Sequence, residues 1–273
     1  MPDGRRLLRA DGLPLIMGIV NVTPDSFSDG GRFIEPKAAI EHALKLASEG
    51  ADILDLGAES SRPGATPITA DEEWRRLEPV LTELCRRSKV PVSVDTYRLE
   101  TALKSLDAGA SMINDITAGR GSDGMFALAA ARSAPVCLMH MRGDPSNMQD
   151  NPQYADVVRE VHEFLARHAR AATVEGVALE RIVVDPGFGF GKRPEHNVAL
   201  VKGLAAFRDL GLVLMGLSRK STLATLSGTD DKERLPESIA GAIVSTCNGT
   251  DILRVHDVGQ TIRALKVAKA MAS

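Results

Sequence analysis

The feature that most constrains the fold of this chain is an alternation, repeated eight times, of a short apolar run with a longer amphipathic stretch. Runs such as IVV and LVLM are apolar without interruption, which is typical of strands buried on both faces in a parallel sheet covered by helices. Eight such units without a Pro/Gly/Ser-rich linker favour a closed barrel over an open doubly wound sheet. We expect strands at 14–23, 51–59, 91–96, 111–117, 135–141, 181–190, 212–218 and 251–258, and helices at 36–49, 70–87, 98–107, 124–131, 154–175, 195–209, 236–248 and 259–271.

The length of the chain agrees with a single α/β barrel. It has 273 residues, and such barrels commonly occupy about 250 residues as one domain. We therefore predict one (β/α)8 TIM barrel with a parallel eight-stranded core over residues 1–273, in which residues 1–13 form an N-terminal lead-in.

The charge balance limits the partners of the chain. It has 33 basic and 36 acidic residues, so there is no basic excess to neutralise a nucleic-acid backbone. The apolar start is interrupted by Asp11, Gly12 and Pro14, and we expect neither a secretory signal nor a membrane partner. The three cysteines are far apart and form no CxxC pair, so we expect them to be reduced and buried in a cytoplasmic protein.

Polar residues end all eight expected strands. Barrel enzymes build their active sites at the C-terminal ends of the strands, from residues of several strands. One polar residue in such a place is usually a turn former or a cap, but eight together predict a site. They are Asn21, residues 59–62, Asp95, Asn114 with Asp115, His140, Asp185, residues 218–220, and Arg254 with His256.

Three of these residues predict a ring-binding site. Asp95, Asn114 and Asp185 end strands three, four and six, which meet across the barrel mouth. A carboxylate in a low-dielectric cup needs a partner, and a flat heterocycle edged with N–H donors would supply one. A pterin or a guanine-like ring fits this description.

Cationic residues at other strand ends predict an anion site. Arg62, Lys220, Arg254 and His256 are donors suited to a phosphate or pyrophosphate. Arg254 and His256 are two residues apart and share one strand face, and we expect both to lie away from the ring-binding residues. Asn21 could offer its amide oxygen to a hard cation.

The glycine-rich segment 185–191 has two interpretations. It lacks the GxGxxG spacing and does not lead straight into a helix, so we reject a dinucleotide site. Phe188 and Phe190 either pack against an aromatic ligand or belong to an ordinary loop. Segment 21–31 is polar and long enough to serve as a lid. The sequence has no HxH, HExxH or Cys/His cluster, which argues against a tightly bound transition metal, and we interpret His140 as a wall residue.

Seven blocks of sequence, in order and spanning essentially the whole chain, resemble the signature blocks of the dihydropteroate synthase family. Seven ordered matches are far more specific than any single motif. The blocks are MGIVNVTPDSFSDGG (17–31), GAESSRPGA (57–65), SVDTYR (93–98), INDITAG (113–119), DPGFGFGK (185–192), GLSRKS (216–221) and RVHDV (254–258).

The resemblance implies a homodimeric transferase of folate biosynthesis. Members of this family join 6-hydroxymethyl-7,8-dihydropterin pyrophosphate to p-aminobenzoate with Mg²⁺, in an SN1-like step that gives 7,8-dihydropteroate and pyrophosphate. Position by position, it implies pterin binding by Asp95, Asn114, Asp185 and Lys220, catalytic roles for Asp95, Asp185 and Lys220, pyrophosphate binding by Asn21, Ser61, Arg62, Arg254 and His256, magnesium binding by Asn21, and a p-aminobenzoate pocket of Phe27, Pro63, Phe188, Phe190 and Ser221.

Two positions depart from the family pattern. Ser61 stands where the family usually has threonine, which keeps the hydroxyl and loses a methyl group. Arg193 and Pro194 replace a more usual Thr-containing start after GFGK.

Three alternatives are weighed against this function. A pterin-binding methyltransferase of the corrinoid pathway would need no pyrophosphate grip, which SRKS and the pair Arg254 and His256 predict. A pterin-binding paralogue without catalysis is disfavoured by the intact motifs. A sugar-phosphate aldolase is the weakest alternative, because Lys220 lies beyond its strand rather than in a Schiff-base position.

Overall fold

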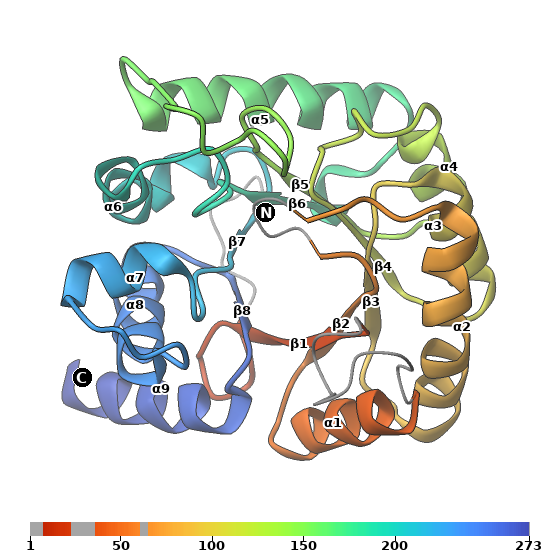
Figure 1. Cartoon of the computed structure of the whole chain (residues 1–273), viewed down its shortest axis with the longest axis horizontal. Coiled ribbons are helices and arrows are strands. Elements are labelled where there is room, and N and C mark those ends of the chain that lie inside the picture. Colours follow the sequence, from red (N-terminus) through yellow and green to blue (C-terminus); the bar gives the residue numbers. More distant parts are fainter. Residues whose placement is uncertain (1–7, 23–35, 61–64, 273) are drawn as a thin grey trace.

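Eight parallel strands close into a barrel in chain order, β1 to β8, as the sequence predicts (Figure 1). The computed structural model describes residues 8–22, 36–60 and 65–272. The strands pair in parallel register all round the ring, for example Asn21 with Gly57 and Asp95 with Asn114. The strands are β1 (Leu15–Asn21), β2 (Ile53–Gly57), β3 (Val92–Asp95), β4 (Met112–Asp115), β5 (Val136–Met139), β6 (Ile182–Asp185), β7 (Leu212–Met215) and β8 (Ile252–Val255).

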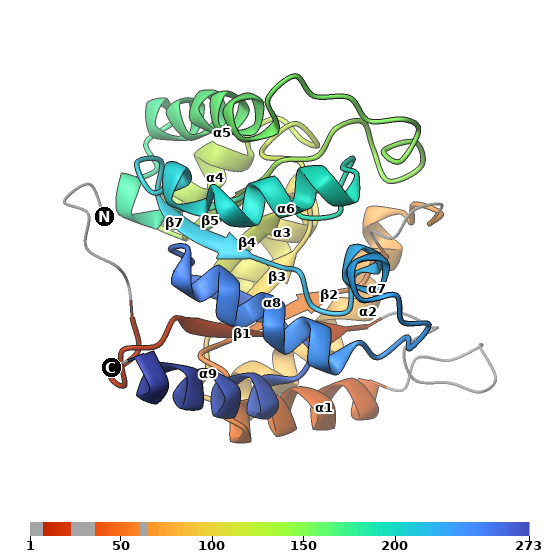
Figure 2. The same cartoon turned by 90° about the vertical axis from the view of Figure 1, so that its left-hand side faces the viewer.

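The helices form a ring outside the barrel (Figures 1 and 2). Between β7 and β8 the structure has the helix expected at 236–248 and, before it, a seven-residue helix that begins at Ser221. Gly228 in the left-handed region (φ 72°) ends this shorter helix. The helices are α1 (Pro36–Ser48), α2 (Ala70–Arg87), α3 (Leu99–Asp107), α4 (Met125–Ala131), α5 (Val157–Val174), α6 (Pro194–Lys202), α7 (Ser221–Ser227), α8 (Leu235–Cys247) and α9 (Val258–Ala272).

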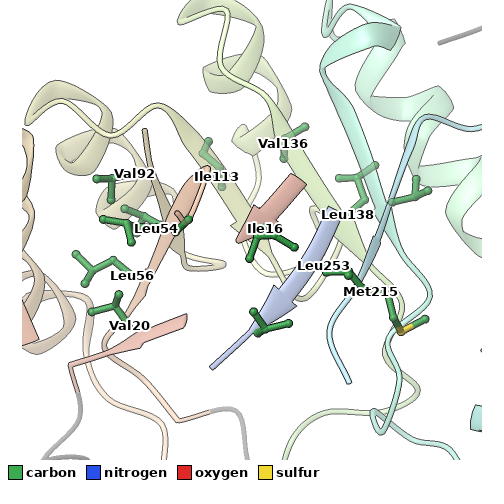
Figure 3. Packing of buried hydrophobic residues seen from close by; sticks show 14 of the residues in the cluster. Ile16, Val20, Leu54, Leu56, Val92, Ile113, Val136, Leu138, Met215 and Leu253 are labelled. Carbon is green, nitrogen blue, oxygen red and sulfur yellow. The ribbon is translucent and has the colours of Figure 1, made fainter. Parts of the chain in front are cut away.

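Alternation along the strands divides the core into two layers. Outward-facing side chains such as Ile16, Leu54 and Leu253 belong to the large cluster between barrel and helices (Figure 3). Inward-facing side chains form a separate apolar cluster that closes the barrel interior below the site. Its buried members are Met17, Met112, Cys137, Val183, Leu214 and Ile252.

This inner cluster positions the site. Side chains two residues further along a strand point the same way, so Asn114 follows Met112, Asp185 follows Val183 and Arg254 follows Ile252 on the inward face. The polar residues at the strand ends therefore lie on an apolar floor, in one layer at the barrel mouth.

The cysteines are free thiols, as expected. Cys137 is buried and Cys85 partly so. Cys247 is exposed, which corrects the expectation of burial. It is the last residue of α8, beyond the positions that this helix buries. Among residues 8–22, 36–60 and 65–272, no helix has the length and apolar character needed to cross a membrane.

Candidate active site

The expected ring-binding residues meet in the upper layer of the barrel. Asp95 ends β3, Asn114 lies in β4 and Asp185 ends β6. Asn114 is 5% exposed and Asp185 is 6% exposed. Parallel strands bring these ends together because their carboxyl ends face the same way.

Arg254 lies among these residues rather than away from them. Its Nη2 donates to Oδ2 of Asp95 at 3.0 Å, and its Nε donates to Oδ2 of Asp55 at 2.6 Å. The expectation that Arg254 sits apart from the ring-binding residues is therefore wrong. Arg254 points inward from β8, and its long side chain reaches across the barrel to β2 and β3.

Asp55 is a site residue that sequence reasoning missed. It lies within β2, is 0% exposed and accepts a hydrogen bond from Nδ2 of Asn114 at 3.0 Å. The signal was present, because a carboxylate inside the apolar run that spans 51–59 must be paired when the strand is buried. Asp55 lies in the middle of its strand, so it is not part of the strand-end pattern.

The charges of this cluster alter the protonation of Asp95. Burial raises the pKa of Asp95 to about 7, and the nearby carboxylate of Asp55 adds to the rise, although Arg254 opposes it. Asp95 can therefore exchange a proton near neutral pH.

Asp185 and Lys220 face the same cup from β6 and the β7–α7 turn. Oδ1 of Asp185 accepts from the backbone N–H of Gly187 at 2.7 Å. Burial raises the pKa of Asp185, while Lys220 opposes the rise. Burial lowers the pKa of Lys220 to about 8, and Asp185 opposes this change.

Lys220 is held by the glycine-rich loop. Its Nζ donates to the backbone carbonyl of Phe188 at 2.5 Å and lies 4.4 Å from the centroid of the Phe190 ring. Phe188 is 2% exposed and packs in the large core cluster, so its visible contribution to the site is its carbonyl group. Phe190 is only partly buried and presents its ring to Lys220.

The glycines of this loop allow it to approach β5 closely. Gly187 has φ 72°, and a Cβ there would lie 1.9 Å from the carbonyl oxygen of His140. Gly191 has φ 65°, and a Cβ there would lie 2.7 Å from the carbonyl oxygen of Arg142. Close packing against the end of β5 therefore explains the alternating glycines, in agreement with the rejection of a dinucleotide site.

Lys192 and His140 form a buried pair behind the loop, and Lys192 is a second residue that the sequence analysis left without a role. Lys192 is 3% exposed, and its Nζ lies 2.9 Å from Nδ1 of His140 and 2.9 Å from the carbonyl oxygen of Phe190. Burial lowers the pKa of Lys192 well below its ordinary value. Burial, followed by the charge of Lys192, lowers the pKa of His140 to about 2, so His140 is a neutral residue. Its place behind the loop agrees with the interpretation as a wall residue.

The remaining expected anion and amine ligands are only partly described. Asn21 ends β1, and His256 lies just after β8 with Nδ1 3.0 Å from Oγ of Ser218. Ser221 is the first residue of α7. The other expected site residues, Phe27, Ser61, Arg62 and Pro63, lie outside the described residues, as does most of segment 21–31.

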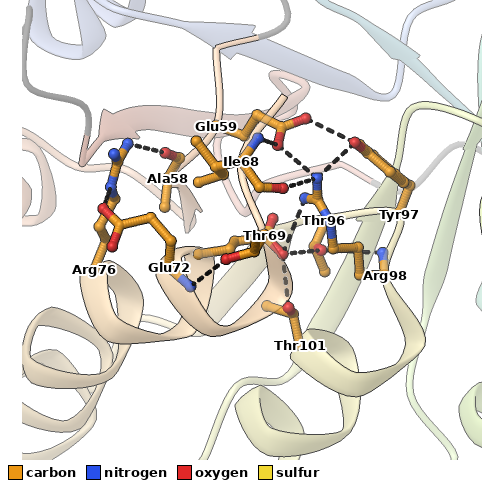
Figure 4. Close-up of polar contacts among 11 residues, drawn as sticks. Ala58, Glu59, Ile68, Thr69, Glu72, Arg76, Thr96, Tyr97, Arg98 and Thr101 are labelled. Atoms are coloured by element: carbon orange, nitrogen blue, oxygen red, sulfur yellow. Dashed lines mark hydrogen bonds and ion pairs between the residues drawn. The ribbon is translucent and has the colours of Figure 1, made fainter. Parts of the chain in front are cut away.

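Glu59 is held in a polar network rather than directed to the ring site (Figure 4). It accepts from Tyr97 Oη at 2.8 Å and from Arg98 Nη2 at 2.7 Å. Arg98 also lies 3.3 Å from the buried carboxylate of Glu73, which accepts from Thr101 at 2.6 Å. This network ties the segment after β2 to α2 and α3.

Two glycines leave room above the floor. A Cβ on Gly57 would lie 3.4 Å from Cβ of Asp95, and one on Gly216 would lie 3.7 Å from Cβ of Arg254 and 4.0 Å from Oδ2 of Asp185. A larger side chain at either position would intrude among the polar groups. Glycine at these two positions therefore keeps a further side chain out of this layer of polar groups.

A cavity of about 380 Å³ lies next to this cup, beside the start of α7. It brings the cations of the β6–α6 turn close to the hydroxyl groups of α7. Its lining residues are Gln149, Asn151, Pro152, Gly189, Lys192, Arg193, Pro194, Ser221, Thr222 and Thr225.

The donor set fits a magnesium ion only together with a substrate's phosphate oxygens. The part of the chain that the structure describes contains no cluster of three or more His, Cys, Asp and Glu residues that could hold a metal. Asn21 offers one amide oxygen, and Mg²⁺ typically takes one or two protein oxygens with phosphates and waters. Asn21 is therefore compatible with a substrate-borne ion.

Comparisons with known proteins agree with this geometry. Residues 17–256 match the family model described as "Pterin binding enzyme". The chain is 46% identical over 265 residues to dihydropteroate synthase of Neisseria meningitidis serogroup B, covering 94% of this chain and 93% of that protein.

Solved structures of the same name are similar throughout. Dihydropteroate synthase of Xanthomonas albilineans with 4-aminobenzoic acid has a TM-score of 0.90 at 45% identity, covering 96% of this chain and 94% of that one. The same organism's enzyme in complex with 7,8-dihydropteroate has a TM-score of 0.87 at 42% identity, covering 97% and 96%. The chain therefore belongs to the dihydropteroate synthase family of pterin-binding enzymes.

Proposed function

We propose that the protein condenses 6-hydroxymethyl-7,8-dihydropterin pyrophosphate with p-aminobenzoate, giving 7,8-dihydropteroate and pyrophosphate in a magnesium-dependent, SN1-like reaction. The observation that carries the proposal is the gathering of Asp95, Asn114 and Asp185 with the cations Lys220 and Arg254 at the barrel mouth. The Xanthomonas structures with 4-aminobenzoic acid and with 7,8-dihydropteroate support the identity of one substrate and of the product.

The acceptors hold the pterin by its N–H edge. Asp185 keeps one oxygen on the backbone of Gly187 and offers its charge to the ring. That charge also stabilises the cation that develops on the ring. Lys220, fixed against the Phe188 carbonyl, donates to a ring acceptor from the opposite side.

The residues that bind the pyrophosphate come mainly from the ends of β1 and β8 and from the segment after β2. We assign Arg254 and His256 to the pyrophosphate, with Asn21, Ser61 and Arg62 as further ligands. Asn21 would hold the magnesium ion with the phosphate oxygens. When bound, magnesium neutralises part of the charge on the leaving group.

Bond breaking precedes bond making in this scheme. The bond between the 6-methylene carbon and the pyrophosphate oxygen breaks, and its electron pair leaves with pyrophosphate. The electron-rich ring stabilises the resulting carbocation, which the amine nitrogen then attacks with its lone pair. The attached proton passes to water. An arylamine is neutral near pH 7, so no side chain is assigned as a general base.

The arylamine is assigned to the space between Phe190 and Ser221. Phe190 presents a partly buried ring, and Ser221 lines the cavity at the start of α7. The carboxylate of p-aminobenzoate would meet the Ser221 hydroxyl, with Phe27 and Pro63 completing the pocket. The ring of Phe188 packs in the outer core, so Phe188 would contribute only its backbone.

The decisive experiment measures pyrophosphate release from the dihydropterin pyrophosphate with magnesium, with and without p-aminobenzoate. We expect dihydropteroate with the amine and slow release of pyrophosphate without it, because the cation forms before attack. Release that strictly requires the amine would contradict the SN1-like step, and no dihydropteroate would contradict the function. A transferable methyl group on a methylated pterin would instead indicate the methyltransferase alternative.

Removing magnesium tests the assigned metal. Chelation with EDTA should abolish turnover and weaken the binding of the pyrophosphate-bearing substrate. It should leave the affinity for the free pterin ring unchanged, because the ring-binding residues are protein side chains. Turnover that survives chelation would contradict the assignment of Asn21 and magnesium.

We also propose a cytoplasmic homodimer. Leu226 of α7 is 57% exposed and Val244 of α8 is 49% exposed, and these two helices pack against each other. The main support is the resemblance to the dihydropteroate synthase family, which implies a homodimer. Light scattering should give twice the mass of one chain, and a monomeric mass would contradict the proposal.

The three free thiols suit a reducing compartment, which cell fractionation can test.

A further inference from the structure

Asp55 is a buried carboxylate to which the proposed reaction gives no task. Ile53, two residues earlier in β2, packs against the inward-facing cluster, whereas Leu54 and Leu56 belong to the outer core. Asp55 therefore points into the barrel, one step above the apolar floor and directly beneath the ring-binding layer.

The position of this carboxylate is energetically demanding. It is 0% exposed, and a buried charge is costly unless it is paired and hydrogen-bonded. Asp55 meets this requirement at one oxygen: Oδ2 accepts from Nε of Arg254 at 2.6 Å and from Nδ2 of Asn114 at 3.0 Å, whereas Oδ1 has no hydrogen-bond partner among the described residues. A buried ion pair often stabilises a fold no more than a well-packed apolar residue would. The geometry therefore indicates a role other than packing.

The contact with Asn114 determines which end of its amide meets a ligand. An ionised carboxylate only accepts hydrogen bonds, so it selects the NH2 group of Asn114. The amide oxygen is then the end available to a ring. Asn114 thereby becomes an acceptor beside Asp95 and Asp185, and all three match N–H donors.

The contact with Arg254 divides the tasks of its guanidinium group. Nε is fixed on Asp55, while Nη2 lies on Asp95 at 3.0 Å. A ring that takes over the carboxylate of Asp95 displaces only Nη2. Arg254 then stays anchored through Nε, and its terminal nitrogens are released toward an anion.

We propose that Asp55 is a positioning residue that sets the ring specificity of the site, by holding the Asn114 amide with its oxygen toward the ligand and by anchoring Arg254. The inference rests on the proposed function in taking pterin as the ring. The oriented amide oxygen explains why the site accepts the 2-amino group of pterin, which is a hydrogen-bond donor. A 2-oxo ring is disfavoured because its carbonyl oxygen would face the acceptor oxygens of the site.

The experiment compares the affinities of pterin and of its 2-oxo analogue lumazine, by calorimetry. Wild-type protein should prefer pterin. In Asp55→Leu no oxygen accepts from Nδ2 of Asn114, so its amide is free to turn, and the ratio of the two dissociation constants should narrow at least tenfold. If the role of Asp55 were merely structural, the variant would bind both ligands more weakly by the same factor, and the ratio would not change. That result would overturn the inference.

A matched control is available at the other end of the barrel. Asp251 is 2% exposed and accepts from the backbone N–H of Val213 at 2.9 Å. Asp251→Leu, which likewise removes the acceptor, should lower the melting temperature without moving the ratio. A ratio that narrows equally in this variant would assign the effect to general loosening of the barrel, and would overturn the role of Asp55.

A second variant keeps the test decisive if Asp55→Leu does not fold. Asn114→Ala leaves Asp55 intact and removes the acceptor, so it should narrow the ratio by a similar factor. The double variant should narrow it no further, because both changes remove the same oriented oxygen. An unchanged ratio in Asn114→Ala would overturn the inference. Wild-type protein that binds no pterin would overturn the proposed function and the inference with it.

Discussion

The two sides of the barrel mouth bury charge in different ways. On one side, called here the ionic side, Asp55, Asp95, Asn114 and Arg254 contact one another directly. On the other, the loop side, His140, Asp185, Lys192 and Lys220 are held mainly by the backbone and ring of the glycine-rich loop. The ionic side consists of fixed strand residues, whereas the loop side depends on a turn that closes against β5.

The difference determines what a ligand must displace. On the ionic side the carboxylate of Asp95 already has Arg254 as a partner, so a ring must exchange with it. On the loop side Asp185 has only a backbone N–H within the described contacts, and its charge is available to the ring. We therefore expect the ionic side to contribute more to stability and specificity, and the loop side more to catalysis.

The largest expected effect is on folding stability, from Arg254→Met. This change leaves the buried carboxylate of Asp55 and the partly buried carboxylate of Asp95 without their cation. Removing one partner of a buried ion pair typically costs about 3–5 kcal/mol. Urea unfolding at pH 7 measures it. Lys220→Met is the matched control on the loop side, and should cost much less because Lys220 contacts a carbonyl group and a ring. If both variants lost the same free energy of unfolding, the distinction between the ionic side and the loop side would be contradicted.

The next effect is on catalysis, from Asp185→Asn. Loss of one preorganised charge should reduce transition-state stabilisation by about 2–4 kcal/mol, or roughly 30- to 1000-fold in turnover. The fold should persist, since the amide oxygen can still accept from Gly187. Steady-state kinetics and a melting curve check both parts. Asp251→Asn, at the opposite end of the barrel, is the reference variant. If Asp185→Asn turned over substrate at the wild-type rate, the catalytic assignment would be contradicted.

The barrel and most of the strand-end residues could be predicted from the sequence because both follow from periodicity. Uninterrupted apolar runs indicate parallel strands, and the topology alone brings Asp95, Asn114 and Asp185 to one end. The partners inside the barrel could not be predicted in the same way. How far the side chain of Arg254 reaches across to Asp55 depends on barrel diameter and rotamer, which no local pattern encodes.

The loop side was harder to predict for another reason. The alternation of glycine and phenylalanine showed that the segment 185–191 is unusual, but not what it packs against. Only the structure shows that Gly187 faces the carbonyl of His140, and that Lys192 turns inward. A lysine at the end of a loop ordinarily indicates solvent, so its burial left no signal in the sequence.

The two sides should also respond to pH with opposite signs. The pKa of His140 is lowered from 6.5 to about 2, so below pH 6.5 only the unfolded chain gains its proton, and stability falls as pH falls. The pKa of Asp95 is raised from 3.8 to about 7, so the folded protein keeps a proton that the unfolded chain loses, and stability falls as pH rises through this interval.

Single variants separate these opposing contributions. Between about pH 4 and 6.5 each group changes the slope of unfolding free energy by up to about 1.4 kcal/mol per pH unit. His140→Gln should therefore tilt the stability curve downward with rising pH, relative to wild type, and Asp95→Asn should tilt it upward. Urea titrations at three pH values in this range measure the slopes. Two variants with the same sign would contradict the contrast.

The smallest expected effect separates His256 from Arg254 at the end of β8. His256 lies beside Ser218, with Nδ1 3.0 Å from its Oγ, whereas Arg254 reaches the ring-binding carboxylate. His256→Ala should weaken pyrophosphate binding by about 1 kcal/mol, the scale of one hydrogen bond, and should leave pterin affinity unchanged. Arg254→Met should weaken the binding of both pyrophosphate and pterin.

The competing explanation is that His256 only ties β8 to β7 through Ser218. Ser218→Ala distinguishes the two, because it removes this tie and keeps the imidazole. If the tie alone mattered, pyrophosphate would raise the melting temperature by the same amount in both variants. Ser218→Ala would itself lower it more than His256→Ala, because the backbone N–H of His256 also donates to Oγ of Ser218 at 3.3 Å and this bond survives in His256→Ala. If His256 contacts the anion, the melting shift induced by pyrophosphate should shrink in His256→Ala and persist in Ser218→Ala, since a ligand stabilises in proportion to its affinity for the folded state.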